Sequence, residues 1–302
     1  MFIYSKHYNL DWDNHIFPVE KYNLVFERIQ SAGIASPGDI FAPEPAKPEE
    51  VSLVHTPQYL RKLHRLAESP SLEILEFEAP LTEQTLLSVM YHTGGTILAV
   101  KTALSRGMAA INLGGGFHHA YSDHGGGFCF INDVAVAIRW AQKSGLIKSC
   151  IVVDLDLHQG NGTAKIFEED SSVFTFSMHQ ENLYPKKEKS SLDVGLADFT
   201  NDSEYLAILS ENLPRLMDSR KYDLLVYVAG ADPFEGDQLG SLKLTKQGLA
   251  KRDEFVLSEA KKRSIPVAAT LAGGYAHNLN DVVEIHVATC REVRRYNFGT
   301  QH

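Results

Sequence analysis

Short β-branched segments alternate with helical segments through the second two-thirds of the chain, and this alternation restricts the possible folds more than any other feature. Strands are predicted from their apolar, β-branched residues at 109–113, 150–156, 173–178, 224–229 and 266–271. Helices are predicted from the spacing of apolar residues at 133–143, 163–169, 203–217, 245–263 and 281–296. Because strands that alternate with helices form right-handed βαβ units, the sequence predicts an α/β fold with a mainly parallel central sheet flanked by helices.

The first third of the chain contains one further predicted strand and three predicted helices. The strand is predicted at 2–4, and the helices at 18–32, 56–66 and 82–106. Residues 42–50 are rich in proline and glutamate and are interpreted as a surface loop. Neither an internal repeat nor a change in composition divides the sequence, so residues 1–302 are expected to form a single domain.

Charge and cysteine content limit the partners and the compartment. The formal net charge of −9 argues against nucleic acid as a standing partner, because such an interface needs clustered positive charge. The same charge weakly favours a basic substrate, such as a lysine-rich peptide. Three cysteines without a C-x-x-C spacing indicate a reducing compartment. The N-terminus has no signal-peptide pattern and no apolar run approaches 18 residues, so we expect a cytoplasmic protein without a membrane span.

The predicted strand at 150–156 runs directly into a row of polar side chains. Asp154, Asp156 and His158 occupy alternate positions, and alternate side chains of an extended chain point to one face. A glycine-containing turn follows them. Charged groups on an otherwise apolar strand need partners, and parallel α/β sheets bind ligands where their strands end. The stretch therefore predicts a functional site at the carboxyl edge of the sheet.

Three further loops present polar side chains after predicted strands. His118 and His119 follow a run of three glycines, Asp232 follows a buried strand and a small-residue turn, and Tyr275 follows two glycines. A neutral imidazole can accept a proton from water while its neighbour tunes its basicity. A tyrosine O–H can donate to a developing oxyanion. These loops therefore predict acid–base and oxyanion-stabilising groups at the same edge of the sheet.

Two carboxylates and one imidazole form a candidate metal site. Asp156, His158 and Asp232 supply the three protein ligands that a catalytic zinc commonly has, with one position open for water. An oxygen-rich donor set also suits Fe(II), so both metals stay open. Water bound to such a metal can attack at neutral pH, which predicts metal-assisted hydrolysis of an amide. The sequence contains no G-x-S-x-G, Walker A or dinucleotide-binding motif that would favour another chemistry.

The glycine-rich run that follows the histidine pair carries two aromatic residues. Phe128 and Phe130 are interpreted with equal weight as walls of a slot and as core residues. Cys129 between them is interpreted as a buried packing residue rather than a nucleophile. His179, which follows the predicted strand at 173–178, is interpreted as a structural histidine.

Together, and in this order along the chain, the motifs resemble those of the zinc-dependent histone deacetylase superfamily. The motifs are Gly-Gly-Gly-Phe-His118-His119-Ala, Gly127-Phe128-Cys129, Asp154-Leu-Asp156-Leu-His158-Gln-Gly-Asn161-Gly, Gly-Ala-Asp232 and Gly-Gly-Tyr275. The runs 15–22 and 232–240, with Gln159 and Asn161, look most like the class IV branch and its bacterial relatives. The resemblance implies a three-layer arginase/deacetylase α/β fold and hydrolysis of an acyl group from a lysine-like amine.

The resemblance implies catalytic roles for the histidine pair and its neighbours. His119 matches the general base and acid, and His118 matches its companion, with Asp154 as the carboxylate partner. Tyr275 matches the tyrosine that polarises the acyl carbonyl. Asn161 stands where many deacetylases have an aspartate, and an amide stabilises an imidazolium less than a carboxylate does.

The resemblance also implies ligand sets and a substrate tunnel. The catalytic metal, expected to be Zn²⁺ with Fe²⁺ as the alternative, would be bound by Asp156, His158 and Asp232. A structural potassium ion is implied at Asp154, Asp156, His158, Ser177 and Met178. The tunnel for the acyl-lysine side chain is implied at Gly127, Phe128, Tyr184 and Leu239.

The expected partner is an acyl-lysine peptide or protein, with an acetyl or a long fatty-acyl group, because class IV relatives are associated with long chains. Polyamine-specific members carry a glutamate at the position aligned with Leu239, so this apolar residue disfavours a polyamine. Deacetylation of a small acylated amine or polyamine stays open as an alternative. A second alternative, motivated by Asn161 alone, is a catalytically weak acyl-lysine-binding module. The sequence does not determine the oligomeric state.

Overall fold

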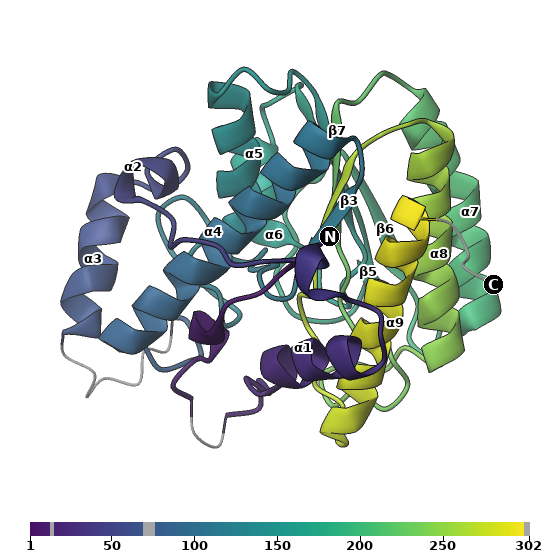
Figure 1. Ribbon diagram of the computed structural model, residues 1–302, viewed down its shortest axis with the longest axis horizontal. Helices are drawn as coiled ribbons and strands as arrows, with labels where there is room; N and C mark the ends of the chain where they lie inside the picture. The colour runs from purple at the N-terminus through teal and green to yellow at the C-terminus, as the bar shows by residue number, and fades with distance from the viewer. Residues whose placement is uncertain (13–14, 69–75, 299–302) are drawn as a thin grey trace.

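The computed structural model describes residues 1–12, 15–68 and 76–298, and its centre is one sheet of eight strands (Figure 1). The order of the strands is β2-β1-β3-β8-β7-β4-β5-β6, and every neighbouring pair is parallel. The strands are β1 (Phe2–Ile3), β2 (Ile40–Phe41), β3 (Ala109–Asn112), β4 (Cys150–Asp154), β5 (Val173–Gln180), β6 (Leu192–Leu196), β7 (Leu224–Val228) and β8 (Val267–Thr270). The predicted parallel α/β sheet is confirmed.

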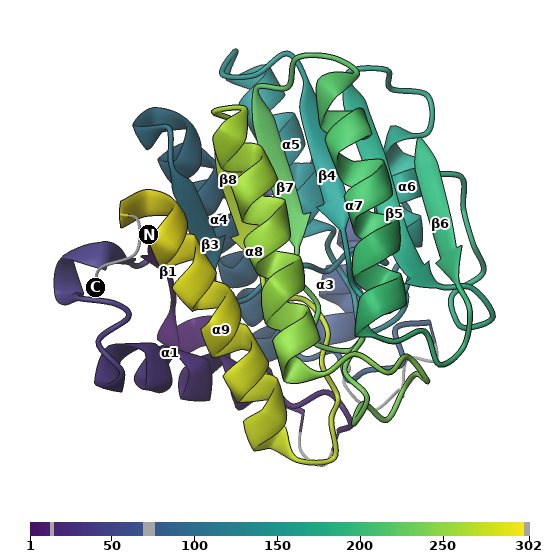
Figure 2. The same cartoon turned by 90° about the vertical axis from the view of Figure 1, so that its right-hand side faces the viewer.

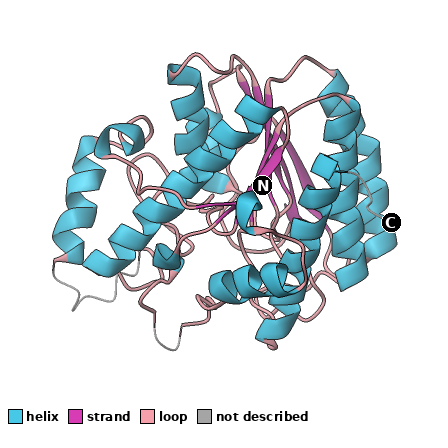
Figure 3. Cartoon of the chain, in the orientation of Figure 1, coloured by secondary structure: helices cyan, strands magenta, loops and turns pink. Residues whose placement is uncertain are grey.

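Helices cover both faces of the sheet and make three layers (Figures 1 and 3). On one side lie α4 (Glu83–Arg106), α5 (Asp133–Lys143) and α6 (Asn161–Phe167), with α2 (Pro48–Val51) and α3 (Pro57–Ala67) outside them. On the other side lie α1 (Lys21–Ser31), α7 (Asp202–Asp218), α8 (Lys246–Lys262) and α9 (Leu279–Phe298). Figure 2 shows α7, α8 and α9 in front of the sheet, with the strand arrows pointing to its lower edge.

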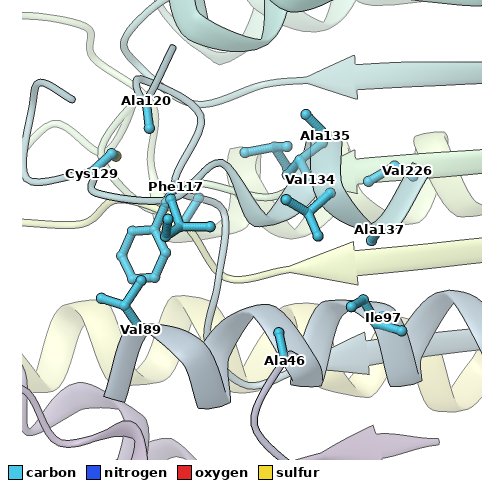
Figure 4. Close-up of a cluster of buried hydrophobic side chains, with 14 of the residues drawn as sticks. Ala46, Val89, Ile97, Phe117, Ala120, Cys129, Val134, Ala135, Ala137 and Val226 are labelled. Atoms are coloured by element: carbon cyan, nitrogen blue, oxygen red, sulfur yellow. The ribbon is translucent and has the colours of Figure 1, made fainter. Parts of the chain in front are cut away.

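Each face of the sheet has its own hydrophobic core, because successive strand side chains point to opposite faces. Val152 of β4 and Val226 of β7 belong to the core under α4 and α5, part of which appears in Figure 4. Ile151 and Val153 belong to the core under α7, α8 and α9. Strands that are buried on both faces have continuous apolar sequences, which is the pattern that identified β4, β7 and β8.

Helix α4 runs unbroken through Gly94 and Gly95, and the lack of a Cβ atom at these two positions lets other segments approach the helix closely. A Cβ atom on Gly94 would lie 1.9 Å from the carbonyl oxygen of Glu44, and one on Gly95 would lie 2.0 Å from the hydroxyl of Tyr8. The helix begins after Thr82, whose hydroxyl accepts a hydrogen bond from the Thr85 N–H. Because Gly94 and Gly95 have no Cβ atom, the segment that contains Tyr8 and Glu44 packs directly on the middle of α4.

Three local predictions were incomplete. The prediction of a surface loop at 42–50 was wrong for Ala46, which is buried and donates its N–H to the Met90 carbonyl at 2.8 Å, and for α2. Strands β2 and β6 were missed, the first because it has two residues and the second because it is polar and partly exposed. Strand β4 ends at Asp154, two residues earlier than expected. That residues 1–302 act as one domain stays a prediction.

Among the described residues, no helix is both long enough and apolar enough to cross a bilayer.

Candidate active site

The loops that follow β3, β4, β7 and β8 meet at the carboxyl edge of the sheet. These four strands are neighbours in the order β3-β8-β7-β4, so their parallel direction brings the four loop starts together. The loops carry His118 and His119 after β3, Asp156 and His158 after β4, Asp232 after β7 and Tyr275 after β8. The structure therefore brings together the side chains that the sequence singled out.

Asp156, His158 and Asp232 form a compact group of metal-ligand type. One potential ligand atom of each residue lies within 4.8 Å of those of the other two, and all three side chains are buried. His158 Nδ1 is 3.3 Å from Asp156 Oδ1 and 3.3 Å from Asp232 Oδ2. Asp232 Oδ2 has no hydrogen-bond partner within the described ranges, although it is buried. A buried carboxylate oxygen without a donor fits a site for a cation.

Backbone N–H groups hold the remaining carboxylate oxygens. Asp156 Oδ2 accepts from the Gly273 N–H at 3.0 Å, and Asp232 Oδ1 accepts from the Leu157 N–H at 2.9 Å. A Cβ atom on Gly273 would lie 2.2 Å from Asp232 Oδ2, and one on Gly230 would lie 2.4 Å from Asp156 Oδ2. Glycine is therefore required at both positions for the loops to approach the carboxylates.

The charges of this group favour a shared cation. Burial and the neighbouring Asp156 raise the pKa of Asp232 to about 6. Burial alone would lower the pKa of His158, but the adjacent carboxylates of Asp156 and Asp232 raise it to about 10. Two adjacent buried carboxylates are thus stabilised by positive charge at His158 Nδ1, which a proton or a metal ion can supply.

The two histidines form one hydrogen-bonded chain with their partners. His118 Nδ1 lies 2.8 Å from Asp154 Oδ2, and His118 Nε2 lies 3.1 Å from His119 Nε2. His119 Nδ1 lies 2.8 Å from Asn161 Oδ1, so it is the protonated nitrogen that donates to this amide oxygen. The amide nitrogen of Asn161 in turn donates to the Tyr121 hydroxyl at 2.9 Å, which fixes the orientation of the amide.

The neighbouring groups give the imidazoles of His118 and His119 different protonation states. Burial alone would lower the pKa of His118, but the carboxylates of Asp154 and Asp156 raise it to about 9. Burial and the neighbouring His118 and His158 lower the pKa of His119 well below its usual value. His119 is therefore the neutral member of the pair, with Nε2 unprotonated, while His118 carries the charge and donates to that nitrogen through its own Nε2–H.

Asp133, at the start of α5, holds the loop that presents the histidines, and the sequence did not single it out. Its carboxylate accepts hydrogen bonds from the N–H groups of Gly116 at 3.0 Å and Phe117 at 2.7 Å, and from the Thr96 hydroxyl at 2.5 Å. The side chain is completely buried. An acidic residue directly after the Asn132 N-cap was the available signal, but such a residue is common in the first turn of any helix.

Tyr275 is buried between aromatic rings beside the metal-ligand group. Its ring centroid lies 5.8 Å from that of Phe17, 6.0 Å from that of Phe128 and 6.4 Å from that of His158. Its N–H donates to Asp237 Oδ2 at 2.7 Å, so the carboxylate of Asp237 anchors the loop. In the sequence, Asp237 stands out only as part of the run 232–240, from which no contact was predicted for it.

A channel of about 220 Å³ leads from the surface to these groups. The four predicted tunnel residues line it, together with Glu78 and Leu183, which no sequence motif marks. The complete lining is Glu78, His119, Gly127, Phe128, His158, Leu183, Tyr184, Leu239 and Tyr275. A second cavity of about 20 Å³ lies beyond, between the glycine loop at 115–117 and the loop at 272–275. Cys129 is buried, as expected, and burial raises the pKa of its thiol well above the usual value.

The residues predicted to bind potassium lie where β4 and β5 end. Asp154 pairs with Ser177 in the strand register, and Met178 is the next residue of β5. Ser177 Oγ is hydrogen bonded to His179 Nδ1 at 2.9 Å, and the buried His179 side chain does not line the channel. Whether a cation binds there stays a prediction.

Residues 15–290 match the sequence profile of the histone deacetylase domain. The chain belongs to the histone deacetylase family. It is 40% identical to an uncharacterised protein of Picosynechococcus sp. over 286 residues, covering 93% of this chain and 94% of the relative. It is 33% identical to histone deacetylase 2 of Arabidopsis thaliana over 286 residues, covering 90% of this chain and 74% of the relative.

Solved structures show the same fold. The HD domain of HDA15 superposes with a TM-score of 0.84 at 21% identity, covering 97% of this chain and 90% of the other. A histone deacetylase homologue complexed with SAHA superposes with a TM-score of 0.83 at 23% identity, covering 97% of this chain and 83% of the other. The expected arginase/deacetylase α/β fold is confirmed, and the family is one of deacetylase-type hydrolases that are generally metal-dependent.

Proposed function

We propose that this chain is a metal-dependent lysine deacylase that hydrolyses the amide bond between an acyl group and a lysine side chain. The observation that supports this most directly is the buried group of Asp156, His158 and Asp232, which lies beside a neutral imidazole and a tyrosine. A narrow channel connects the group to the surface. Metal-assisted hydrolysis needs these parts together: ligands, a base, an oxyanion donor and access for the substrate.

Asp156, His158 and Asp232 would hold the catalytic metal, for which we propose Zn²⁺, with Fe²⁺ as the alternative. A divalent cation at this position supplies a Lewis acid for the acyl oxygen and lowers the pKa of water to about 7. We also propose a structural K⁺ ion bound by oxygen atoms of Asp154, Asp156, His158, Ser177 and Met178.

His119 would act as the general base and then as the general acid. Its Nε2 takes a proton from water as the water oxygen bonds to the acyl carbon, and it returns this proton to the nitrogen of lysine as the amide C–N bond breaks. Asn161 keeps the other ring nitrogen protonated and the ring oriented, through the contact of 2.8 Å at His119 Nδ1. His118, charged and paired with Asp154, stabilises the negative charge that develops next to it.

Tyr275 would donate its hydroxyl to the acyl oxygen as negative charge develops there. Burial raises the pKa of this hydroxyl well above its usual value, so it stays protonated and remains a donor. The loop that carries it is anchored on both sides, because its N–H donates to Asp237 and its carbonyl accepts from the Gln238 side chain at 2.7 Å. A fixed donor loses little energy to reorganisation during the reaction.

The channel supports a lysine side chain as the substrate. Phe128, Leu183 and Leu239 give it apolar walls that suit the four methylene groups of lysine, and Tyr184 lies at its exposed end, with 45% of its surface accessible. The apolar Leu239 disfavours a second cationic group, which speaks against a polyamine. The cavity of about 20 Å³ beyond the channel has room for about one water molecule, which is similar in size to a methyl group. We therefore propose acetyl-lysine over lysine with a long fatty-acyl chain.

Two broader assignments complete the proposal. We assign the chain to the class IV branch on the runs 15–22 and 232–240, and we propose that it acts in the cytoplasm. Both rest on the sequence.

The test is turnover of a lysine-peptide panel from acetyl to myristoyl, with acetylated polyamines alongside, by protein loaded with one defined metal. We expect acetyl-lysine to give the highest kcat/KM, and the value to fall by roughly 10-fold or more per added methylene once the acyl chain exceeds the cavity. Faster turnover of myristoyl-lysine would contradict the chain-length proposal alone. Turnover of polyamines but not of peptides would favour a small-amine deacetylase, and turnover of nothing by zinc-loaded protein would favour an acyl-lysine-binding module.

A further inference from the structure

A completely buried arginine lies directly behind the metal-ligand group. Arg252 extends from α8, and its side chain has no exposed surface. Its Nη1 donates to the carbonyl oxygen of Leu155 at 3.1 Å and to that of Gly230 at 2.7 Å. These carbonyls lie just beyond the ends of two different strands, β4 and β7. The guanidinium therefore bridges the two backbones one residue before Asp156 and two residues before Asp232.

The bridge lies where the sheet stops holding the two strands together. The last register pair of β4 and β7 is Asp154 with Val228, and the last backbone hydrogen bond joins the Leu155 N–H to the Val228 carbonyl at 3.1 Å. Beyond this point both chains leave the sheet to present their carboxylates. Arg252 supplies hydrogen bonds at the position where the next pair of the ladder would have been.

A second set of contacts holds the guanidinium itself. Arg252 Nε donates to Asp253 Oδ1 at 2.8 Å, and Asp253 is also buried. The carboxylate of Asp253 accepts from the Tyr227 hydroxyl at 2.5 Å and from the Thr289 hydroxyl at 2.6 Å. Burial alone would lower the pKa of Arg252, but Asp253 raises it overall, so the guanidinium stays charged. The arginine is thus held by α8, α9 and β7 at the same time.

We propose that Arg252 is a positioning residue for the metal site, which sets the separation of Asp156 and Asp232 by clamping the carbonyls of Leu155 and Gly230. The inference rests on the proposed metal binding. A planar guanidinium can reach two carbonyls and one carboxylate at once, whereas an ammonium group is a single point of contact. Loss of the clamp would leave two buried carbonyls without donors, and the strand ends would move apart to find new ones. Outer residues of this kind affect metal affinity because they orient the ligands.

The experiment measures the affinity of the metal-free protein for Zn²⁺ by competition with a chromophoric chelator. Arg252→Lys keeps the positive charge but removes the planar guanidinium, whose several N–H donors bridge the two carbonyls. If that variant is too unstable to purify, the double variant Arg252→Met with Asp253→Asn removes both buried charges, so that neither is left uncompensated, and it keeps an amide oxygen as acceptor for the Tyr227 or Thr289 hydroxyl. The control is Arg139→Met, which breaks a partly buried ion pair with Asp170, away from the carboxyl edge of the sheet.

We expect the Zn²⁺ dissociation constant to rise by roughly 10–100-fold in Arg252→Lys and in the double variant, and to stay within about 3-fold in Arg139→Met. At saturating Zn²⁺, KM for an acetyl-lysine peptide should change less than kcat, because the channel walls are untouched. A folded double variant that binds Zn²⁺ as tightly as the parent protein would refute the positioning role and leave the proposed function intact. Failure of the parent protein to bind either Zn²⁺ or Fe²⁺ would instead refute the proposed function.

Discussion

Replacing Asn161 by aspartate changes the electrostatics of the proposed base without changing the size of its partner. Asn161 Oδ1 lies 2.8 Å from His119 Nδ1, and the asparagine side chain is buried. With a carboxylate there, the two charge centres would be about 4 Å apart, and an effective dielectric constant of about 20 gives an attraction of about 4 kcal/mol. Since 1.36 kcal/mol corresponds to one pKa unit, the pKa of His119 would rise by at most about 3 units.

Burial of the new carboxylate opposes part of this gain, so the expected rise in the pKa of His119 is about 1–3 units. The base must be neutral to act, and burial together with His118 and His158 now lowers its pKa well below the usual value. Raising this pKa therefore moves the acidic limb of the pH profile to higher pH. Activity at low pH should fall in Asn161→Asp, while the rate on the plateau should stay equal or increase because a stronger base accepts the proton.

The assay is the pH dependence of kcat/KM for an acetyl-lysine peptide at saturating metal. Asn161→Ser is the matched control, because it removes the contact with His119 without adding a charge. This control should lower the plateau rate and should not move the acidic limb to higher pH. An acidic limb that coincides in Asn161→Asp and the parent protein would refute the assignment of His119 as the titrating base.

Four further results are expected. Tyr275→Phe should lower kcat by roughly 10²–10³-fold, the usual effect of losing one oxyanion donor, and a decrease of only a few-fold in steady-state assays would remove Tyr275 from the mechanism. Asp232→Ala should abolish retention of the metal after gel filtration, and full occupancy by elemental analysis would contradict its role as a ligand. Removal of the metal with a chelator should lower the Tm, since a ligand at 1,000 times its Kd stabilises the fold by about 4 kcal/mol, and the Tm of Asp232→Ala should not respond. Asp133→Asn leaves one of the loop N–H groups without an acceptor and should lower the free energy of unfolding by about 1.5–3 kcal/mol in chemical denaturation, with a larger effect on kcat than on KM.

The sequence was sufficient to predict an element or a site wherever the pattern of a few neighbouring residues determines it. Apolar, β-branched runs predict β4, β7 and β8 because these strands are buried on both faces. Alternation predicted that Asp154, Asp156 and His158 share one side, and Leu155 and Leu157 between them do lie in the core of one sheet face, although β4 itself ends at Asp154. Parallel strands then bring all the loops at their carboxyl ends to one edge, so a shared site for loops far apart in the sequence also follows from the pattern.

Contacts between segments that are far apart in the sequence depended on the tertiary structure. The buried role of Arg252 follows from the crossing of α8 behind the ends of β4 and β7, and a charged residue on a helix ordinarily predicts an exposed face. Glu78 enters the channel from a loop that no sequence motif marks. The volume beyond the channel depends on how closely the loops at 115–117 and 272–275 approach each other.

The protonation of His118 and His119 shows most clearly which properties depend on local sequence and which depend on the fold. The sequence alone determined that two adjacent imidazoles follow a glycine turn. The family resemblance predicted Asp154 as the partner of His118 and Asn161 as the partner of His119, and the fold brings these residues, 36 and 42 positions further along the chain, to 2.8 Å from the two rings. Local spacing determines which way a side chain points, because it depends on the dihedral angles of a few residues. The charge on that side chain depends on burial and on neighbours brought in by the packing of distant strands, which no local pattern records.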